Sequence, residues 1–188
     1  MSSFDRPADS DIEPSPWVVR FAHLIEAGGT VLDLACGDGR HARFFAHRGH
    51  PVTAVDVDIS GVRDLQQDAS VHVLKTDLED GAWPFTDIQF QGIVVANYLH
   101  RPHFRPLVDA LAPDGVLLFD TFGAGNEKLG HPRNPDFLLQ PGELLAAFLP
   151  TLNVVAYEWG QESDPRPAVR QRICAIKSGE PVGLDPEN

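Results

Sequence analysis

The sequence predicts a doubly wound α/β fold, in which helices cover both faces of a mostly parallel seven-stranded sheet with an antiparallel strand at its edge. Short apolar runs of strand length alternate with segments of helical periodicity, and the connection 160–167 between the last two runs is too short for a parallel crossover. The runs expected as strands are 31–35, 52–56, 71–75, 92–96, 116–122, 152–159 and 169–176. Helices are expected at 17–27, 40–48, 60–68 and 103–111, with another opening near 137 and ending near 150.

The first predicted strand and the elements after it have the pattern of a nucleoside-binding unit. The strand 31–35 leads into a turn that contains Gly37 and Gly39, where the missing Cβ atoms let a ligand approach the backbone. A helix over 40–48 follows, and the next strand ends at Asp56. This carboxylate lies about 20 residues beyond the turn, where such units place the group that accepts hydrogen bonds from both ribose hydroxyls.

Two classes of cofactor fit this unit. The spacing Gly37-x-Gly39-x-x-Ala42 satisfies the dinucleotide pattern, so the glycines alone do not exclude NAD. Asp33, however, sits inside the first strand and is expected to point toward the ligand end, where it would repel a pyrophosphate. A cationic ligand group fits an anion at that position better.

The run Val31-Leu32-Asp33-Leu34-Ala35-Cys36-Gly37-Asp38-Gly39 resembles the first motif of class I S-adenosylmethionine-dependent methyltransferases. The resemblance extends from about Trp17 to Lys177 and implies the Rossmann-like fold of that family. It also implies S-adenosylmethionine as the cofactor and S-adenosylhomocysteine as its product. The segments 97–102, 137–139 and 141–144 are more loosely similar to small bacterial methyltransferases of the tellurite-resistance type.

The resemblance implies a set of cofactor-binding residues at the carboxyl ends of the strands. Asp77, after the third strand, takes the place of the family residue that contacts the adenine amino group, and the Leu78 backbone is the candidate partner of the ring nitrogen. The complete expected set is Asp33, Ala35, Gly37, Gly39, Asp56, Val57, Asp77, Leu78 and Asn97.

The acceptor side is expected where the fourth strand delivers a polar cluster to the ligand end of the sheet. Tyr98 and His100 are the candidate catalytic residues, with His100 as the base if the acceptor must lose a proton. Arg101 and, by resemblance, Trp17 are candidate substrate-binding residues, and the long loop 123–140 is expected to fold over the site. No metal site is expected, because His100-x-x-His103 lacks a third ligand at regular spacing.

Composition limits the partners and the compartment. The net charge of −12 and the absence of a lysine- or arginine-rich run disfavour nucleic acid, and no run approaches the length of a membrane span. Cys36 and Cys174 lie in apolar runs and are expected to be buried thiols in a reducing, cytoplasmic environment. We expect a flexible acidic arm at 1–16, the methyltransferase domain at 17–177, a polar tail at 178–188, and a monomer or homodimer.

The predicted function is therefore an SN2 transfer of a methyl group from S-adenosylmethionine to a small-molecule nucleophile or, with less support, to a protein. Two alternatives stay open at this point. One is a protein that binds S-adenosylmethionine or another nucleoside without transfer activity. The other is a small NAD-dependent oxidoreductase, against which Asp33 and the lack of a Tyr-x-x-x-Lys set both argue.

Overall fold

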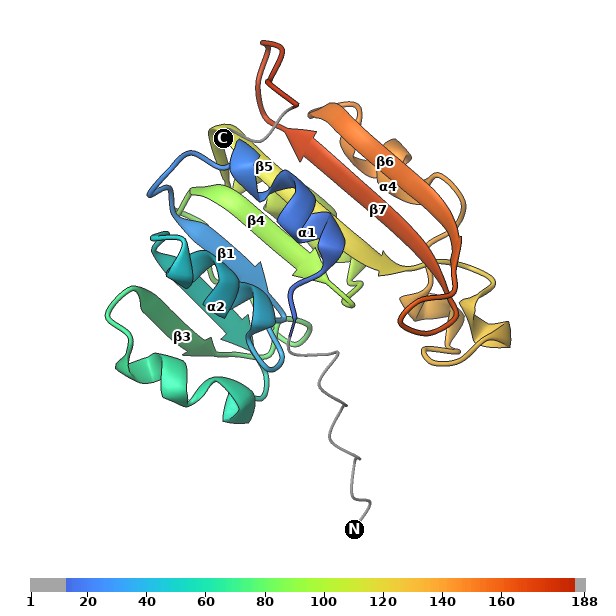
Figure 1. Ribbon diagram of the computed structural model, residues 1–188, viewed down its shortest axis with the longest axis horizontal. Coiled ribbons are helices and arrows are strands. Elements are labelled where there is room, and N and C mark those ends of the chain that lie inside the picture. Colours follow the sequence, from blue (N-terminus) through green and yellow to red (C-terminus); the bar gives the residue numbers. More distant parts are fainter. Residues whose placement is uncertain (1–12, 185–188) are drawn as a thin grey trace.

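A computed structural model describes residues 13–184 and places seven strands in one twisted sheet (Figure 1). The strands are β1 (Val31–Leu34), β2 (Val52–Asp56), β3 (Val71–Lys75), β4 (Phe90–Ala96), β5 (Leu111–Phe122), β6 (Asn153–Glu162) and β7 (Ala168–Ile176). Their order is β3-β2-β1-β4-β5-β7-β6. The first five pair in parallel, and β7 runs antiparallel to both of its neighbours, β5 and β6. The predicted fold class, with its antiparallel pair at one edge, is confirmed.

Helices cover both faces of the sheet. They are α1 (Pro16–Phe21), α2 (Arg40–His47), α3 (Phe104–Asp109) and α4 (Glu143–Phe148). In Figure 1, α1 and α2 lie on the near face and α4 on the far face. Two hydrophobic cores result, one beneath α1 and α2 and one beneath α3 and α4. Every strand that lies between them must therefore be apolar on both sides.

Strand β1 shows this double burial directly. Leu32 and Leu34 belong to the core of α3 and α4, whereas Val31 belongs to the core of α1 and α2. Successive side chains of a strand point to opposite faces, so the uninterrupted apolar run of the sequence reflects burial on both faces. Asp33 is the exception in this strand, and it is also buried.

Two of the expected helices are shorter than their sequence pattern indicates. The helix expected over 17–27 ends at Phe21 and continues only as a 3-10 turn, Ala22–Leu24, before Ile25 becomes extended. The helix expected over 60–68 is two separate 3-10 turns, Ser60–Val62 and Asp64–Gln67. Here Gly61 packs so closely against Asp38 that a Cβ would overlap it, and this contact fixes the local path of the chain.

The N-terminal boundary also differs from the expectation. Part of the predicted arm, residues 1–12, lies outside the described residues, but Ser15 is buried and caps α1 by accepting a hydrogen bond from the Trp17 amide at 3.2 Å. Pro16 occupies the first helical position, where its missing N–H has no cost. At the other end, Val182 of the predicted tail packs against the core of α1 and α2.

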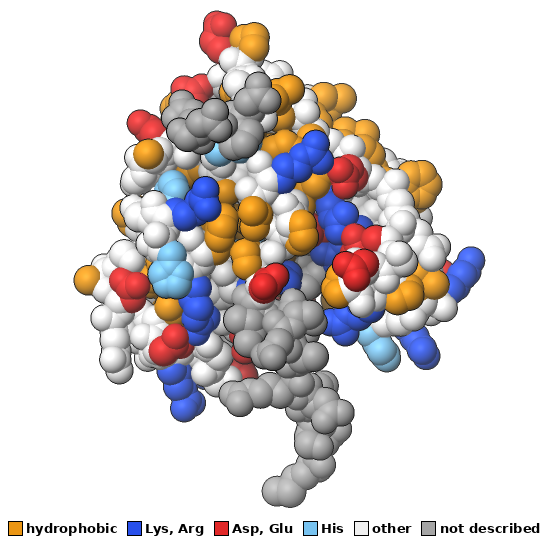
Figure 2. Space-filling view, in the orientation of Figure 1, with side chains coloured by type: hydrophobic (Ala, Val, Ile, Leu, Met, Phe, Trp, Pro, Cys, Tyr) orange, Lys and Arg blue, Asp and Glu red, His pale blue; other side chains and the backbone are white. Residues whose placement is uncertain are grey.

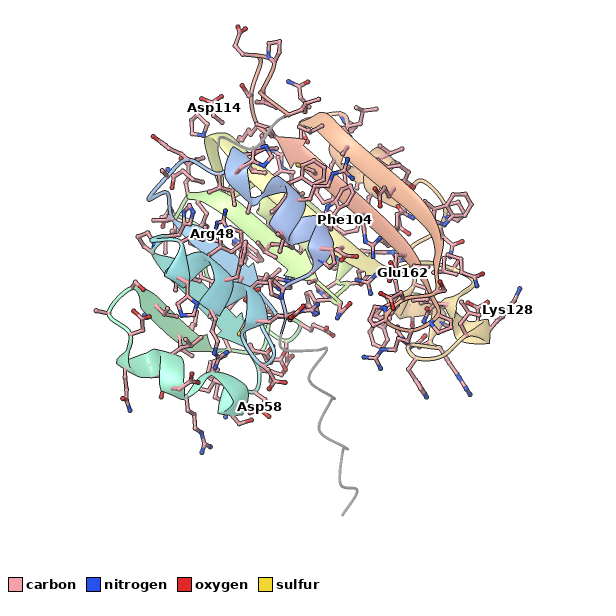
Figure 3. All side chains as sticks on the ribbon, viewed as in Figure 1. Arg48, Asp58, Phe104, Asp114, Lys128 and Glu162 are labelled. Carbon is pink, nitrogen blue, oxygen red and sulfur yellow. The ribbon has the colours of Figure 1, made fainter. Side chains whose placement is uncertain are left out.

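The carboxyl ends of β1, β2 and β4 meet along one edge of the sheet because these strands are parallel and adjacent. In Figure 3, Asp58, which follows β2, and Glu162, which ends β6, both lie toward the carboxyl ends of the parallel strands, one near each end of the row of strands. Asp114 lies at the opposite end of the strands. Any ligand that contacts the first turn and Asp56 must therefore lie along the carboxyl edge.

Candidate functional site

A cavity of about 390 Å³ opens at the carboxyl ends of β1, β2 and β4. Its size lies within the range of roughly 300–1,000 Å³ that is usual for small-ligand sites. Three segments and one distant side chain line it: Ala35, Cys36, Gly37, Asp38, Arg40 and His41 after β1, Asp56 at the end of β2, Ala96, Asn97 and Tyr98 at the end of β4, and Arg166 from the β6–β7 hairpin. Of the predicted cofactor-binding residues, Ala35, Gly37, Asp56 and Asn97 belong to this wall.

The turn after β1 uses left-handed backbone conformations to bring its amides to the cavity. Ala35 has φ 55°, Gly37 has φ 54° and Gly39 has φ 74°, a region that glycine adopts without a Cβ clash. Cys36 returns to the sheet through its amide, which donates to the Val55 carbonyl at 3.0 Å. At Gly39 a Cβ would also overlap Val62, so both the backbone conformation and the packing favour glycine at this position.

Asp56 is arranged as a dual hydrogen-bond acceptor. Its Oδ2 accepts from the Gly37 amide at 2.9 Å, and its Oδ1 accepts from the Asp58 amide at 3.0 Å. A carboxylate offers about four lone-pair directions, so one acceptor position on each oxygen remains for a ligand. Two vicinal hydroxyls of a ribose match that remaining geometry.

Asp33 lies beneath the turn and does not line the cavity. Its side chain is buried, and Oδ2 accepts from the amide of Ala42 in the first turn of α2 at 2.9 Å. Burial raises the pKa of this carboxyl to about 7, although the Ala42 amide and Arg40 oppose the rise. This placement corrects the expectation that Asp33 meets the ligand directly: its visible contact holds the start of α2 against β1.

His41 belongs to the cavity wall and had no assigned role in the sequence analysis. Its Nε2 accepts a hydrogen bond from the Ser15 amide at 3.1 Å, so the proton of the neutral ring is on Nδ1, which lies 3.9 Å from Asp33 Oδ1. Burial, assisted by Arg40, lowers the pKa of His41 to about 3. At neutral pH the ring is therefore uncharged, and it already accepts a hydrogen bond through Nε2.

Asn97 is fixed by a buried ion-pair network in the neighbouring strands. Arg170 of β7 donates from Nη1 to Asn97 Oδ1 at 2.7 Å, and from Nε and Nη2 to Asp120 Oδ1 at 3.0 and 2.6 Å. Arg172 donates from Nε to the same Asp120 oxygen at 3.0 Å, while Ser15 donates from Oγ to Asp120 Oδ2 at 2.6 Å. Burial alone would raise the pKa of Asp120, but the two arginines hold it below its usual value.

This network joins two walls of the cavity through residues that the sequence analysis missed. One branch reaches Asn97 through Arg170, and the other reaches His41 through Ser15. A signal was present in the sequence, because Asp120, Arg170 and Arg172 are charged residues inside runs otherwise read as buried strands. Their pairing depends on the register that sets Asp120 opposite Arg172, and spacing along the chain does not give that register.

The two candidate catalytic residues take different positions. Tyr98 lines the cavity, and burial, with the nearby charge of Glu79, raises the pKa of its hydroxyl. His100 is half-buried and is not part of that wall, and the centre of its ring lies 4.4 Å from that of His103. Burial and His100 lower the pKa of His103 to about 4. The rings of Tyr98, His100 and Trp83 therefore form one cluster around the His103 ring, whose centre lies 5.0 Å from that of Trp83.

The two candidate substrate-binding residues are engaged away from the cavity. Trp17 is 4 % exposed within the core of α1 and α2, and its indole N–H donates to the Ile173 carbonyl at 3.3 Å. Arg101 pairs with Glu143 and donates to the carbonyls of Asp136 and Leu138. Trp17 is thus a core residue, and Arg101 anchors the loop after β5. No residue of that loop is in the cavity wall described above.

The remaining residues predicted to bind the cofactor lie near the ends of β2 and β3. Val57 follows Asp56 and is 57 % exposed, as a side chain available to a flat ligand must be. Asp77 is exposed and accepts a hydrogen bond from the Glu79 amide at 2.9 Å, which forms an Asx turn. The Leu78 side chain is buried in the core of α3 and α4, which leaves only its backbone for a ligand.

Comparison with known proteins agrees with the geometry. Residues 31–115, from β1 into the start of β5, match the methyltransferase domain family. Among curated relatives, malonyl-[acyl-carrier protein] O-methyltransferase of Serratia marcescens is 36 % identical over 109 residues, which are 55 % of this chain and 42 % of the relative. The aligned region is thus less than half of the relative's length.

Solved structures extend the likeness to nearly the whole chain. TehB from Haemophilus influenzae superimposes with a TM-score of 0.69 at 16 % identity, over 90 % of this chain and 62 % of TehB. The 1,6-didemethyltoxoflavin-N1-methyltransferase of Burkholderia thailandensis, crystallised with S-adenosylhomocysteine, gives a TM-score of 0.65 at 19 % identity, over 90 % and 80 % of the two chains. At these identities the likeness shows the fold. The domain match over 31–115 and the likeness in fold agree with the resemblance of the first motif to class I S-adenosylmethionine-dependent methyltransferases.

Several other features of the described residues bear on the site. Over 13–184, no helix is long and apolar enough to cross a membrane. In the same part of the chain, no three histidine, cysteine or acidic side chains gather where they could hold a metal ion. Both cysteines are buried free thiols, as predicted. Figure 2 shows basic and acidic side chains interspersed on the face that carries α1 and α2.

Proposed function

We propose that this protein transfers the methyl group of S-adenosylmethionine to a small-molecule nucleophile, with the cofactor lying along the cavity. The observation that carries the proposal is the Asp56 carboxylate. It faces the turn 35–37 and retains two acceptor positions suited to a ribose diol. The exposed Val57 beside it and the backbone at Leu78 would hold the adenine.

The chemistry supplied by the cofactor is a sulfonium-bound methyl carbon, which a lone pair of the acceptor attacks as the carbon–sulfur bond breaks. The task of the protein is alignment and exclusion of water, which can contribute roughly 7–11 kcal/mol to lowering a barrier. The turn 35–37 and the segment 96–98 both line the cavity and would fix the two reactants. The Tyr98 ring stands in this wall, where its face would favour a nearby cationic centre.

Three titratable groups of the cavity wall offer little general-base capacity at neutral pH. The pKa of His41 is lowered to about 3, and burial raises the pKa of both the Cys36 thiol and the Tyr98 hydroxyl. The wall therefore favours an acceptor that is already deprotonated when it binds, such as a thiolate, a chalcogen anion or a carboxylate. If the acceptor must lose a proton, we propose His100, two residues after Tyr98, as the group that takes it.

Titration with S-adenosylhomocysteine, 5′-methylthioadenosine and NAD tests this proposal. We expect both adenosyl thioethers to bind and raise the melting temperature, because a ligand of the native state alone stabilises by about 2.7 kcal/mol at a hundredfold excess over Kd. NAD should not bind. Binding of NAD without binding of S-adenosylhomocysteine would favour the oxidoreductase alternative instead.

A further inference from the structure

Two buried polar atoms beside the cavity have no hydrogen-bond partner among the described residues 13–184. They are the hydroxyl oxygen of Tyr98 and Nδ1 of His103. The centres of the two rings lie 6.3 Å apart, with an angle of 34° between the ring planes. A buried polar group without a partner has lost its bonds to water and gained nothing in return, so folded proteins retain few of them. Two of them in neighbouring rings at a ligand cavity point to a bond that forms when the site is in use.

One of the two atoms is a donor and the other is an acceptor. Burial and the nearby charge of Glu79 raise the pKa of the Tyr98 hydroxyl, so it keeps its proton at neutral pH. Burial and His100 lower the pKa of His103 to about 4, so its ring is neutral and has one proton-free nitrogen. A hydrogen bond to the Leu78 backbone opposes this fall, as a carbonyl that accepts from a ring N–H does. Because Nδ1 has no partner, that N–H belongs to Nε2, and Nδ1 carries the free lone pair.

His103 connects the cavity wall to the segment between β3 and β4. This segment, 76–89, contains no helix or strand of its own. The centre of its Trp83 ring lies 5.0 Å from that of His103 and 5.4 Å from that of Phe85. The same segment carries Leu78, whose backbone is expected to hold the adenine. The His103 ring is 7 % exposed, so it is the buried group on which this part of the segment packs.

Tyr98 has room to move, whereas His103 is enclosed. The Tyr98 side chain lines the cavity, while its hydroxyl oxygen is buried away from solvent. A ligand in the cavity takes up the space on the open side of the ring and favours positions in which the hydroxyl points into the cluster around His103. One hydrogen bond formed there satisfies both buried atoms without exposing either of them to water.

We infer that His103 is a positioning residue of the cofactor site, and that its Nδ1 accepts a hydrogen bond from the Tyr98 hydroxyl when the adenosyl group of the cofactor occupies the cavity. The bond joins the wall after β4 to the segment that carries Leu78 and Trp83, and so holds that segment against the bound cofactor. This inference rests on the proposed function, because it takes the adenine to lie at Leu78. His103 does not touch the ligand and acts through Tyr98 and Leu78.

The experiment titrates the parent, Tyr98→Phe, His103→Phe and the double variant with S-adenosylhomocysteine and with 5′-methylthioadenosine. Both ligands carry the adenosyl group, so both report the same bond. Each substitution keeps an aromatic ring in the cluster and removes its polar atoms. Tyr157→Phe is the matched control, because it also removes a buried hydroxyl without a partner in the described chain, from β6 and outside the cavity wall.

Without ligand, Tyr98→Phe and Tyr157→Phe should melt at or above the temperature of the parent, because each removes an unpaired buried hydroxyl. Tyr98→Phe should nevertheless bind both adenosyl ligands roughly three- to tenfold more weakly, whereas Tyr157→Phe should stay within about twofold of the parent. In the His103→Phe background, the Tyr98 substitution should have no further effect on affinity. A melting temperature without ligand that falls together with the affinity would show that Tyr98 has only a structural role and would overturn the inference.

Nitrogen NMR of the histidine rings gives a second readout that packing alone does not change. Comparison with His103→Phe assigns the signals of His103. When the parent is saturated with S-adenosylhomocysteine, Nδ1 of His103 should shift from the position of a free proton-free nitrogen toward that of a hydrogen-bonded one. The shift should be absent in Tyr98→Phe. The affinity and melting temperature of Tyr98→Phe test the inference even if His103→Phe does not fold.

Two further results would overturn the inference while the proposed function stands. One is unchanged affinity of Tyr98→Phe for both adenosyl ligands, or an equal loss from the Tyr98 substitution with and without the His103 ring. The other is an Nδ1 signal of His103 that does not move on saturation of the parent. A parent protein that binds neither adenosyl ligand would overturn the proposed function as well.

Discussion

Arg101 and Glu143, on opposite sides of the long loop after β5, form a two-point ion pair. Nε of Arg101 lies 2.6 Å from Oε1 of Glu143, and Nη2 lies 3.1 Å from Oε2. The same guanidinium donates to the carbonyls of Asp136 and Leu138. One side chain of the 3-10 turn Arg101–His103, which follows β4, therefore holds the last part of the loop against α4.

Arg101→Leu should loosen the loop 123–142 without changing the affinity for S-adenosylhomocysteine, since Arg101 does not line the cavity. Loss of the four hydrogen bonds should speed amide exchange in the loop by a factor that corresponds to about 1–2 kcal/mol of local stability. Hydrogen exchange read by mass spectrometry measures this effect. Arg105→Leu is the matched control, because Arg105 forms an exposed pair with Asp109 only. Equal effects of the two substitutions would mean that Arg101 does not anchor the loop.

Asp56→Asn should weaken S-adenosylhomocysteine and 5′-methylthioadenosine alike, because both ligands carry the ribose. Replacing one acceptor oxygen with a donor removes a charge-assisted bond of about 1.5–3 kcal/mol, or roughly tenfold to a hundredfold in Kd. Isothermal titration calorimetry gives both constants. The neighbouring Asp58→Asn should have a much smaller effect, since that carboxylate accepts from the Ser60 amide and does not line the cavity. Unchanged affinity in Asp56→Asn would place the ribose elsewhere.

Asp33→Asn should stabilise the protein increasingly as the pH rises. Burial raises the pKa of Asp33 from 3.8 to about 7, so between these values the folded state binds more protons than the unfolded chain, and the parent loses stability as pH rises. The slope is at most about 1.4 kcal/mol per pH unit. Asparagine can still accept the Ala42 amide. Urea denaturation of parent and variant from about pH 4 to about pH 8 measures the difference.

His41→Gln gives the complementary test with the opposite sign. Burial lowers the pKa of His41 from 6.5 to about 3, so the parent loses stability from this group as pH falls through that window. The variant should therefore show a weaker loss on the acid side. Both tests concern one cluster, because His41 faces Asp33, with Arg40 and Asp120 also acting on it. If the difference in free energy of unfolding between parent and variant did not vary with pH, the assigned protonation states would be wrong.

Gly39→Ala should destabilise the fold more than Gly49→Ala. Both glycines have a positive φ, 74° and 84°, so each substitution costs roughly 1–2 kcal/mol for a left-handed alanine. Only at Gly39 would the new Cβ also overlap Val62, whereas nothing lies within 4 Å at Gly49. Urea denaturation measures both free energies of unfolding. An equal loss would show that the Val62 side chain moves aside without cost.

His100→Ala should lower methyl transfer and leave the affinity for S-adenosylhomocysteine near that of the parent, because His100 lies outside the cavity wall. An acceptor must first be found by screening thiols, chalcogen anions and small carboxylates with labelled S-adenosylmethionine. Turnover and cofactor titration are then measured on the same preparation. Turnover equal to that of the parent would remove His100 from the mechanism and favour an acceptor that needs no base.

The parts of the site that the sequence predicted are those encoded locally. The turn with Gly37 and Gly39, its following helix and the strand ending in Asp56 are consecutive in the chain, and their spacing determines their relation. Asn97 and Tyr98 line the cavity, and the signal for this position in the sequence is the buried strand that precedes them. The helix expected over 60–68 failed because Asp58 and Gly61 impose a local path that periodicity does not detect.

The missed parts depend on pairing between distant segments. Nothing near Ser15 in the sequence indicates that its hydroxyl meets Asp120 and its amide meets His41. The role of Arg170 follows only once β7 is known to lie beside β5, with β6 outside it. Asp33 was expected in the cavity because it lies in β1, just before the turn that lines the cavity. The first turn of α2, however, covers its side chain.

The placement of β7 has a consequence for the order in which the protein is made. Asn97 and Asp120 leave the ribosome well before Arg170, and β6 has no neighbour in the sheet until β7 has paired. A nascent chain that ends before residue 168 can thus form the parallel half of the sheet. In that chain Asp120 has neither Arg170 nor Arg172 as a partner, and Asn97 lacks its bond to Arg170. The turn and Asp56 are available early in synthesis, whereas Asn97 of the cavity wall gains its anchor only after β7 has emerged.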